Sequence, residues 1–184
     1  RSTLLPYTAR FRCGADTKTR NIDKTNDYYW RMNSRRMESQ VVRDSLLHLT
    51  GELDLTMGGP SIEPSPNARR RALYFLHSRD KQSKFLATFD DAEILSCYER
   101  TESIVPQQAL ALSNAKVPLD VSEILGKRGP KDNESYIRQV FSDILCRPPT
   151  DEELQECLGF LKDIPKRSRL VHALLTHNDF LTIR

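Results

Sequence analysis

The clearest pattern of apolar and polar positions lies in the last third of the chain. Apolar residues recur there at spacings of three and four, the period of an amphipathic helix that buries one face. Asp132 can cap the first of these helices, and Thr150 with Glu153 forms a capping box before the second. Pro165 separates the second helix from the third. The pattern predicts a three-helix part over residues 132–184 that packs as a small bundle.

A second apolar stripe predicts a helix over residues 27–49, with Asp27 as its N-cap and Gly51 ending it in the left-handed conformation. Residues 1–27 are polar and irregular, which predicts an N-terminal arm. We therefore expect residues 28–184 to form a single helical domain. The apolar positions that define the stripe are Trp30, Met37, Val41, Val42, Leu46 and Leu49.

The middle of the chain is less regular. Residues 51–66 contain three glycines and three prolines and predict a loop. Residues 72–76 are apolar and partly aromatic, so they are the best strand candidate, although five residues also fit a buried helical turn. Pro106 suits the first turn of a helix, which Pro118 should kink or split. The predicted fold class is mainly α, a helical bundle with a small irregular or β-containing segment around residues 69–100.

Composition places the chain among ordinary globular domains. Apolar residues make up 38% and charged residues 29%, and no apolar run is long enough for a membrane span. The net charge of +3 is too small to indicate a nucleic-acid partner by itself. Of the 28 basic residues, 19 are arginine, which favours intramolecular pairs between the basic first half and the acidic second half. The chain begins with Arg1, so we expect a fragment of a longer protein.

The cysteines and histidines predict no metal site and no haem in this chain. Cys13, Cys97, Cys146 and Cys157 form no C-x-x-C pair, and no cysteine has the spacing of a haem attachment site. A disulfide between Cys146 and Cys157 fits an oxidising compartment, and buried free thiols fit equally well. The spacing of five between His172 and His177 places them on different sides of a helix.

Two groups of residues are candidates for chemistry. Asp90 and Asp91 form the densest acidic cluster outside a predicted helix, and paired carboxylates can divide acid and base roles. The alternative, which we favour, is that one of them pairs with Arg71 or Arg100 and holds a loop. Cys97 and His77 are a nucleophile and a base by residue type, but nothing in the sequence brings them together.

The second group is basic and aromatic. Arg69, Arg70 and Arg71 precede Tyr74, and such a set could bind acidic or sulfated glycans. A solvated entry into the following segment is the simpler interpretation. For Arg100 we expect an architectural role, in which its buried guanidinium bridges a carboxylate, with Asp90 the first choice.

An ordered series of short motifs resembles a known family. The series runs from residues 30–38 (WRMNSRRME) and 42–47 (VRDSLL) through 57–60 (MGGP) and 106–112 (PQQALAL) to a final stretch, 172–181 (HALLTHNDFL). It resembles the C-terminal domain of unknown function of large planctomycete proteins, over roughly residues 28–184. The departures are the missing run before Trp30 and the polar residues 81–84.

The resemblance implies an exported, periplasmic, multidomain parent protein whose c-type cytochrome domain carries the haem. It implies no established reaction and no established catalytic residue. We therefore expect a non-catalytic accessory or interaction domain whose partners are other domains of the parent. The alternatives are a polysaccharide-acting hydrolase domain, with Asp90 or Asp91 as acid or base, and a glycan-binding module that uses arginine and aromatic side chains.

Overall fold

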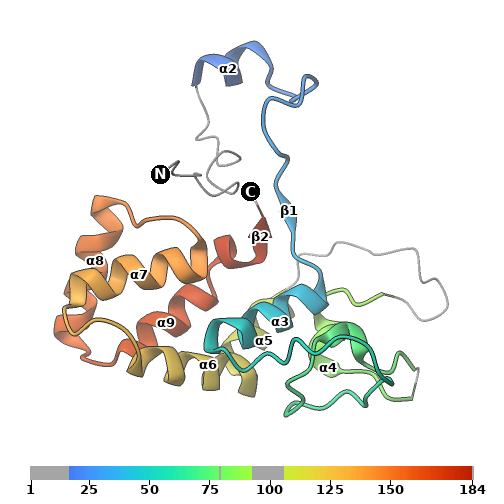
Figure 1. The fold of residues 1–184 in the computed structure, drawn as a ribbon. Coiled ribbons are helices and arrows are strands. Elements are labelled where there is room, and N and C mark those ends of the chain that lie inside the picture. Colours follow the sequence, from blue (N-terminus) through green and yellow to red (C-terminus); the bar gives the residue numbers. More distant parts are fainter. Residues whose placement is uncertain (1–16, 79, 93–105, 184) are drawn as a thin grey trace, which may run out of the picture. The chain divides into compact units, whose positions relative to one another are not determined.

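The chain is mainly helical, with one small two-stranded antiparallel sheet, as the sequence predicts (Figure 1). The computed structural model describes residues 17–78, 80–92 and 106–183. Its α-helices are α2 (Thr17–Ile22), α3 (Ser39–Thr50), α4 (Lys84–Thr88), α5 (Pro106–Asn114), α6 (Lys116–Lys127), α7 (Asn133–Leu145), α8 (Asp151–Asp163) and α9 (Arg167–Leu175). The short elements are the 3₁₀ helices η1 (Ala72–Tyr74) and η2 (Asn178–Leu181) and the strands β1 (Arg35–Arg36) and β2 (Thr182–Ile183).

The chain divides into two compact units. One consists of Arg1–Arg36 and Thr182–Arg184, and the other of Met37–Leu181. We call them the terminal unit and the helical unit. The sheet belongs to the terminal unit, where Arg35 of β1 lies opposite Ile183 of β2.

The predicted helix over residues 27–49 is wrong in its first half, because side chains in the terminal unit satisfy the backbone there. The Asp23 carboxylate accepts hydrogen bonds from the amides of Asp27 and Tyr28, each at 3.0 Å. The Asn26 side chain donates to the Arg31 carbonyl at 2.9 Å and accepts from its amide at 3.2 Å. Aspartate and asparagine compete with helix formation in this way. Helix α3 therefore begins at Ser39, twelve residues after Asp27.

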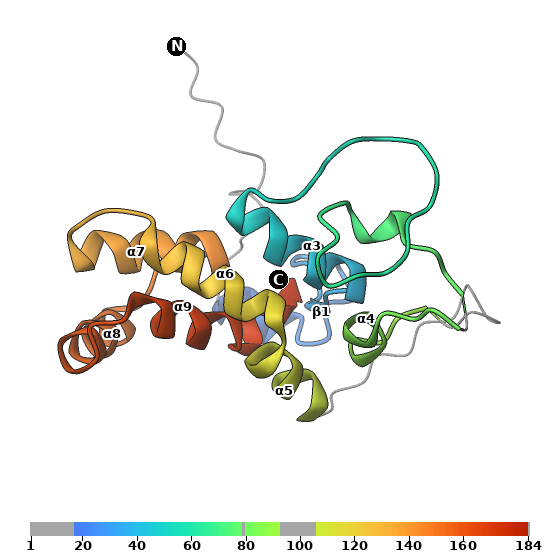
Figure 2. The same ribbon diagram turned by 90° about the horizontal axis from the view of Figure 1, so that it is seen from below.

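The core of the helical unit lies between α3, α5, α6, α7, α8 and α9. It contains Val42 and Leu46 of α3, which have no exposed surface, together with inward side chains from the other helices. Figure 2 shows α6 against α3 and α9, the two helices with which it packs most extensively. The predicted bundle of α7, α8 and α9 therefore includes α6 as a further member, contributed by the stretch that Pro118 divides. Pro118 lies in the first turn of α6, where its missing amide costs no hydrogen bond.

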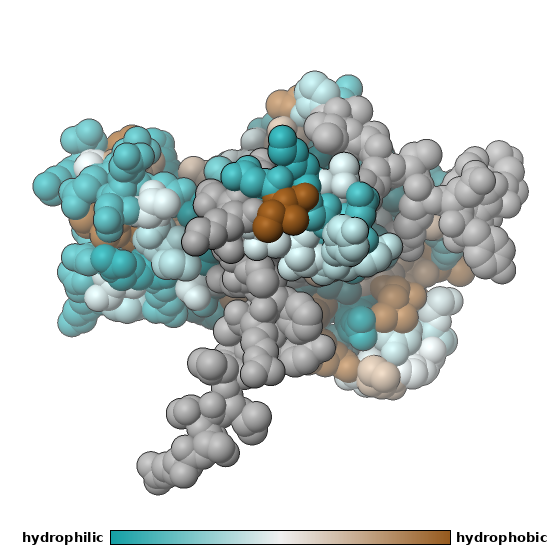
Figure 3. Space-filling view, turned by 90° about the horizontal axis from the view of Figure 1, so that it is seen from above, coloured by the Kyte–Doolittle hydropathy of each residue, from teal (hydrophilic) through white to brown (hydrophobic). Residues whose placement is uncertain are grey.

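Local signals place the last helices as predicted. The Asp132 carboxylate accepts from the Ser135 amide at 2.8 Å, and Thr150 and Glu153 form the reciprocal capping box of α8. Gly51 ends α3 with a left-handed φ of 74°. On the left of Figure 3, the surface over α7 and α8 is mostly hydrophilic. The exposed charged residues of these two helices include Glu134, Arg138, Asp151, Glu152 and Glu156.

Residues 72–76 do not form the predicted strand. Ala72–Tyr74 is a 3₁₀ turn, and the β character of the segment is limited to isolated bridges that join Asp54 to Arg70 and Ile62 to Phe75. The alternative prediction, a buried helical turn, is closer to the structure. Ala72 is buried, and its amide donates a hydrogen bond to Asp44 of α3. The irregular stretch from residue 51 to residue 78 thus lacks a regular hydrogen-bond ladder of its own.

Arginine side chains connect this stretch, and a second loop, to the helices in one recurring way. Arg43 stacks on Phe75 with its guanidinium carbon 4.5 Å from the ring centroid, and it donates to the carbonyls of Ala68 and Arg70. Arg167 stacks on Tyr136 at 4.3 Å and donates to the carbonyls of the loop before α7. Each guanidinium thus combines a cation–π contact with hydrogen bonds to loop carbonyls.

Candidate functional site

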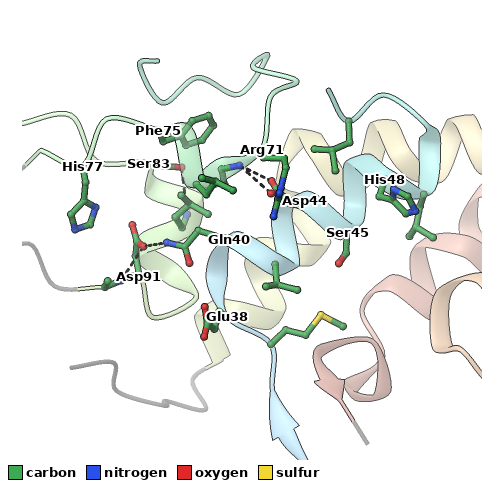
Figure 4. Close-up of a pocket in the computed structure, with 18 of the residues that line it drawn as sticks. Glu38, Gln40, Asp44, Ser45, His48, Arg71, Phe75, His77, Ser83 and Asp91 are labelled. Carbon is green, nitrogen blue, oxygen red and sulfur yellow. Dashed lines mark hydrogen bonds between the residues drawn. The ribbon is translucent and has the colours of Figure 1, made fainter. Parts of the chain in front are cut away.

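The helical unit contains a cleft of about 870 Å³, near the upper end of the range for ligand pockets. Its floor is one face of α3, and its walls are η1 with the residues after it, the start of α4, and the end of α7 (Figure 4). Helix α3 serves the core and the cleft at once. Val42 and Leu46 face the core, and Val41 and Asp44 on the other side face the cleft.

The lining is largely apolar and reaches the surface. Four large apolar side chains of the lining are strongly exposed: Leu55 by 61%, Leu73 by 55%, Val41 by 41% and Leu76 by 38%. Burying such groups in water-free contact is favourable by roughly 25 cal/mol per Å². Exposed apolar side chains grouped at one cleft are typical of a surface that meets another molecule.

Buried polar contacts attach one wall of the cleft, η1, to its floor, α3. Arg43 is 4% exposed, and its Nη1 donates to Asp44 Oδ1 at 2.9 Å. Burial lowers the pKa of Arg43, and the neighbouring Asp44 carboxylate opposes that shift. Asp44 also accepts from the Ala72 amide at 2.9 and 3.1 Å, which holds the start of η1 against α3. The pair of Arg43 and Asp44 is therefore architectural.

The structure does not place Asp90 and Asp91 as a matched acid and base. Asp90 has a left-handed φ of 58°, and its Oδ2 accepts from the Gln108 side chain at 3.2 Å. Asp91 lines the cleft, and its Oδ1 accepts from Gln40 Nε2 at 2.5 Å, as Figure 4 shows. Each carboxylate is thus held by a neutral amide, and the Asp90 contact joins the irregular segment to α5. Among the described residues, Gln108 is one partner of Asp90, and the expected pair of Asp90 with Arg100 stays a prediction because Arg100 lies outside the described residues.

The basic candidates separate into three different environments. Arg69 forms an ion pair with Glu52 at 3.2 Å. Arg70 stacks on Tyr74 at 3.9 Å and donates to the carbonyls of Gly58 and Pro60. Arg71 is partly buried and lines the cleft.

Tyr74 is covered on one side by Arg70, and its hydroxyl accepts from the Gly58 amide at 2.8 Å. It therefore acts as a support for the loop. The remaining candidate, Arg100, lies outside the described residues, as does Cys97, so the predicted burial of Arg100 stays a prediction.

The other candidate side chains in the described ranges are histidines and cysteines. His48 and His77 line the cleft, and no cluster of three metal-ligating side chains occurs between residues 17 and 183 outside the gaps at 79 and 93–105. Cys146 and Cys157 are free thiols, and Cys146 is exposed, so it is not the buried thiol that we expected. We expected arginine ion pairs between the two halves of the chain. The arginine ion pairs among the described residues instead lie within one half, as between Arg147 and Glu153.

Sequence reasoning missed the cleft itself. The available signal was in α3, where apolar residues at Val41 and Leu49 extend the stripe beyond the width that one core-facing side needs. The opposite wall comes from residues 71–78, and no local pattern shows which helix that irregular segment will contact.

The family described as "Protein of unknown function (DUF1553)", PSD1, matches residues 5–161 of the chain. The chain belongs to this family. The match confirms the expected domain of unknown function; it begins before residue 28 and ends within α8, whereas the resemblance was placed over residues 28–184. The comparisons with curated proteins and with solved structures found no match.

The cleft of this DUF1553 chain lies inside the matched region for most of its lining, including all of α3 and η1. No helix in the described part of the chain is both long and apolar enough to cross a bilayer.

Proposed function

We propose that this DUF1553 domain is a non-catalytic accessory or interaction domain of a larger exported multidomain protein, and that its cleft docks another segment of that protein. The observation that carries the proposal is the group of exposed apolar side chains at one cleft, namely Val41, Leu55, Leu73 and Leu76. A neighbouring domain that covered them would remove apolar surface from water.

The state of the polar groups supports docking over catalysis. A general acid or base must reach the reacting atoms and must have a pKa suited to the task. Asp44 is occupied by Arg43 and the Ala72 amide, and Asp91 by Gln40. The hydrolase alternative rests on Asp90 and Asp91, which both have architectural contacts here. The glycan alternative rests on Tyr74, which Arg70 covers.

The proposed setting follows from the resemblance of the motifs. In it the parent is a planctomycete protein of the periplasm, with a c-type cytochrome domain that carries the haem, and this domain contributes no cofactor. The occupant of the cleft is then a segment of one of the neighbouring domains.

Photo-crosslinking in the full-length parent protein tests the proposal. A photo-reactive phenylalanine analogue replaces Leu73 at the cleft rim, and a matched control replaces Gln155, an exposed residue of α8. We expect the probe at position 73 to crosslink to one defined segment outside these 184 residues, identified by mass spectrometry, and the probe at position 155 to give no such product. Crosslinks from position 73 that stay within this domain, or that join two copies of the protein, would refute the proposal.

A further inference from the structure

The cleft contains one cation whose charge is not matched within the described residues. Arg71 lines the cleft and is partly buried, yet its guanidinium forms no ion pair and no hydrogen bond with any residue that the structure describes. The other long basic side chain of the lining, Lys81, is bonded to Glu63. A partly buried guanidinium gains from a carboxylate partner, and Arg71 has none among the described residues.

Asp44 does not supply the missing partner. Figure 4 shows Arg71 and Asp44 on the same side of the cleft, but the ion pair of Asp44 is made with Arg43. The remaining oxygen contacts of Asp44 go to the Ala72 amide. The negative charge of Asp44 is thus already matched by a cation that is 4% exposed.

From this juxtaposition we infer that the cleft recognises a peptide segment that combines apolar side chains with a carboxylate, and that Arg71 binds the carboxylate. The inference rests on the proposed docking function and adds the chemistry of the docked segment. The planar guanidinium presents parallel N–H donors that match the two oxygens of a carboxylate. The exposed leucines of the rim would cover the apolar side chains on either side.

A peptide fits the cleft better than a small enclosed ligand. Small-molecule pockets bury most of their ligand's surface, whereas this cleft opens where Leu55 and Leu73 are more than half exposed. Those two side chains come from separate parts of the irregular stretch, so an occupant must extend across both to cover them.

Binding of a matched pair of probes to the full chain tests the inference. The first probe is N-acetyl-leucyl-leucine, which has a free carboxylate, and the second is its C-terminal amide, which has the same apolar groups and no charge. Chemical shifts of backbone amides, followed by NMR during titration, give the affinity and the location of each probe. We expect both to shift residues of the cleft, and the acid to bind about fivefold more tightly at low salt, because a partly exposed ion pair is weaker than a buried one.

Substitution of Arg71 identifies the group that binds the carboxylate. Arg71→Gln should remove the preference for the acid and leave the affinity for the amide unchanged, and Arg71→Glu should reverse the preference. Arg138→Gln is the matched control, because Arg138 is an exposed arginine of α7 that pairs with Glu134. The control should keep the fivefold preference. The thermal midpoint of each variant shows whether it is folded. We expect no change for Arg71→Gln, because its side chain has no partner to lose among the described residues.

The outcomes separate this inference from the docking function. If acid and amide bind the cleft with equal affinity, or if Arg71→Gln keeps the preference, the carboxylate assignment is overturned and apolar docking stands. If neither probe shifts any cleft residue, the inference and the apolar docking on which it rests both fail. A preference that disappears in Arg71→Gln alone supports the assignment.

Discussion

Gly126 allows α6 and α9 to approach closely, and its replacement by alanine is a sharp test of that packing. An ideal Cβ at position 126 would lie 2.7 Å from the backbone nitrogen of Ser168 and 2.8 Å from its Cα. Real Cβ atoms essentially never show contacts under 3.0 Å, and these contacts are with backbone, which cannot rotate away. The two helices must therefore separate locally to admit one methyl group.

Two effects of opposite sign decide the outcome of Gly126→Ala. Alanine favours a helix over glycine by about 0.5–1 kcal/mol, mainly because it restricts the unfolded chain. Overpacking a tight contact costs about 1–3 kcal/mol. Because the clash involves the backbone of α9, we expect the second effect to be larger, and the free energy of unfolding to fall by about 1–2 kcal/mol.

Gly159→Ala is the matched control. Gly159 is an exposed glycine of α8, and a Cβ there meets nothing within 4 Å. Only the helix preference remains, so this variant should be more stable than the parent by about 0.5–1 kcal/mol. Urea unfolding followed by circular dichroism gives both values. If Gly126→Ala is as stable as Gly159→Ala, the close contact of α6 and α9 does not exist in solution.

Three further predictions concern other parts of the chain. Leu174→Ala should lower the free energy of unfolding by about 2–5 kcal/mol in urea titrations, because Leu174 is 7% exposed in the core, and a loss under about 0.5 kcal/mol would contradict that packing. Hydrogen bonds from Arg147 lower the pKa of Glu153 from 4.5 to about 2, so the stability it contributes is present above pH 4.5 and lost as the pH falls towards 2. Between pH 4.5 and 2, Glu153→Gln should therefore lose less free energy of unfolding than the parent does. Equal losses in the two proteins would disprove the lowered pKa of Glu153. Elemental analysis of the purified chain should find neither zinc nor iron in stoichiometric amount.

The helices after residue 105 could be predicted because their signals are local. Asp132, Thr150 and Glu153 act within one turn, and the apolar stripes they precede have only one side to bury. The start of α3 could not be predicted from the stripe alone. Asp23 and Asn26 lie in the polar stretch before the predicted N-cap, and their side chains bind the backbone of residues 27–31 in a non-helical conformation.

The cleft itself could not be predicted, although two of its residues could be named as candidates. Asp91 and Arg71 are candidates by residue type, and both line the cleft. Residue type does not show that Asp91 has a hydrogen-bond partner while Arg71 has none among the described residues. The partner of Asp91 is Gln40, 51 positions earlier in the chain. Long-range pairing of this kind depends on how an irregular segment lies across a helix, and sequence periodicity carries no information on that.

The arginine contacts imply an asymmetry in which substitutions the irregular stretch tolerates. Arg43 donates to the carbonyl oxygen at position 68, and Arg70 donates to those at positions 58 and 60. A carbonyl is supplied by whatever amino acid stands there. The accepting positions can therefore change identity while the interaction persists, whereas lysine at either donating position lacks the planar set of donors. In a library of variants covering residues 51–78 together with α3, tolerance should be broad at Ala68 and narrow at Arg43, although the two residues share one hydrogen bond. The shape of this wall is thus encoded mainly in the few side chains that donate.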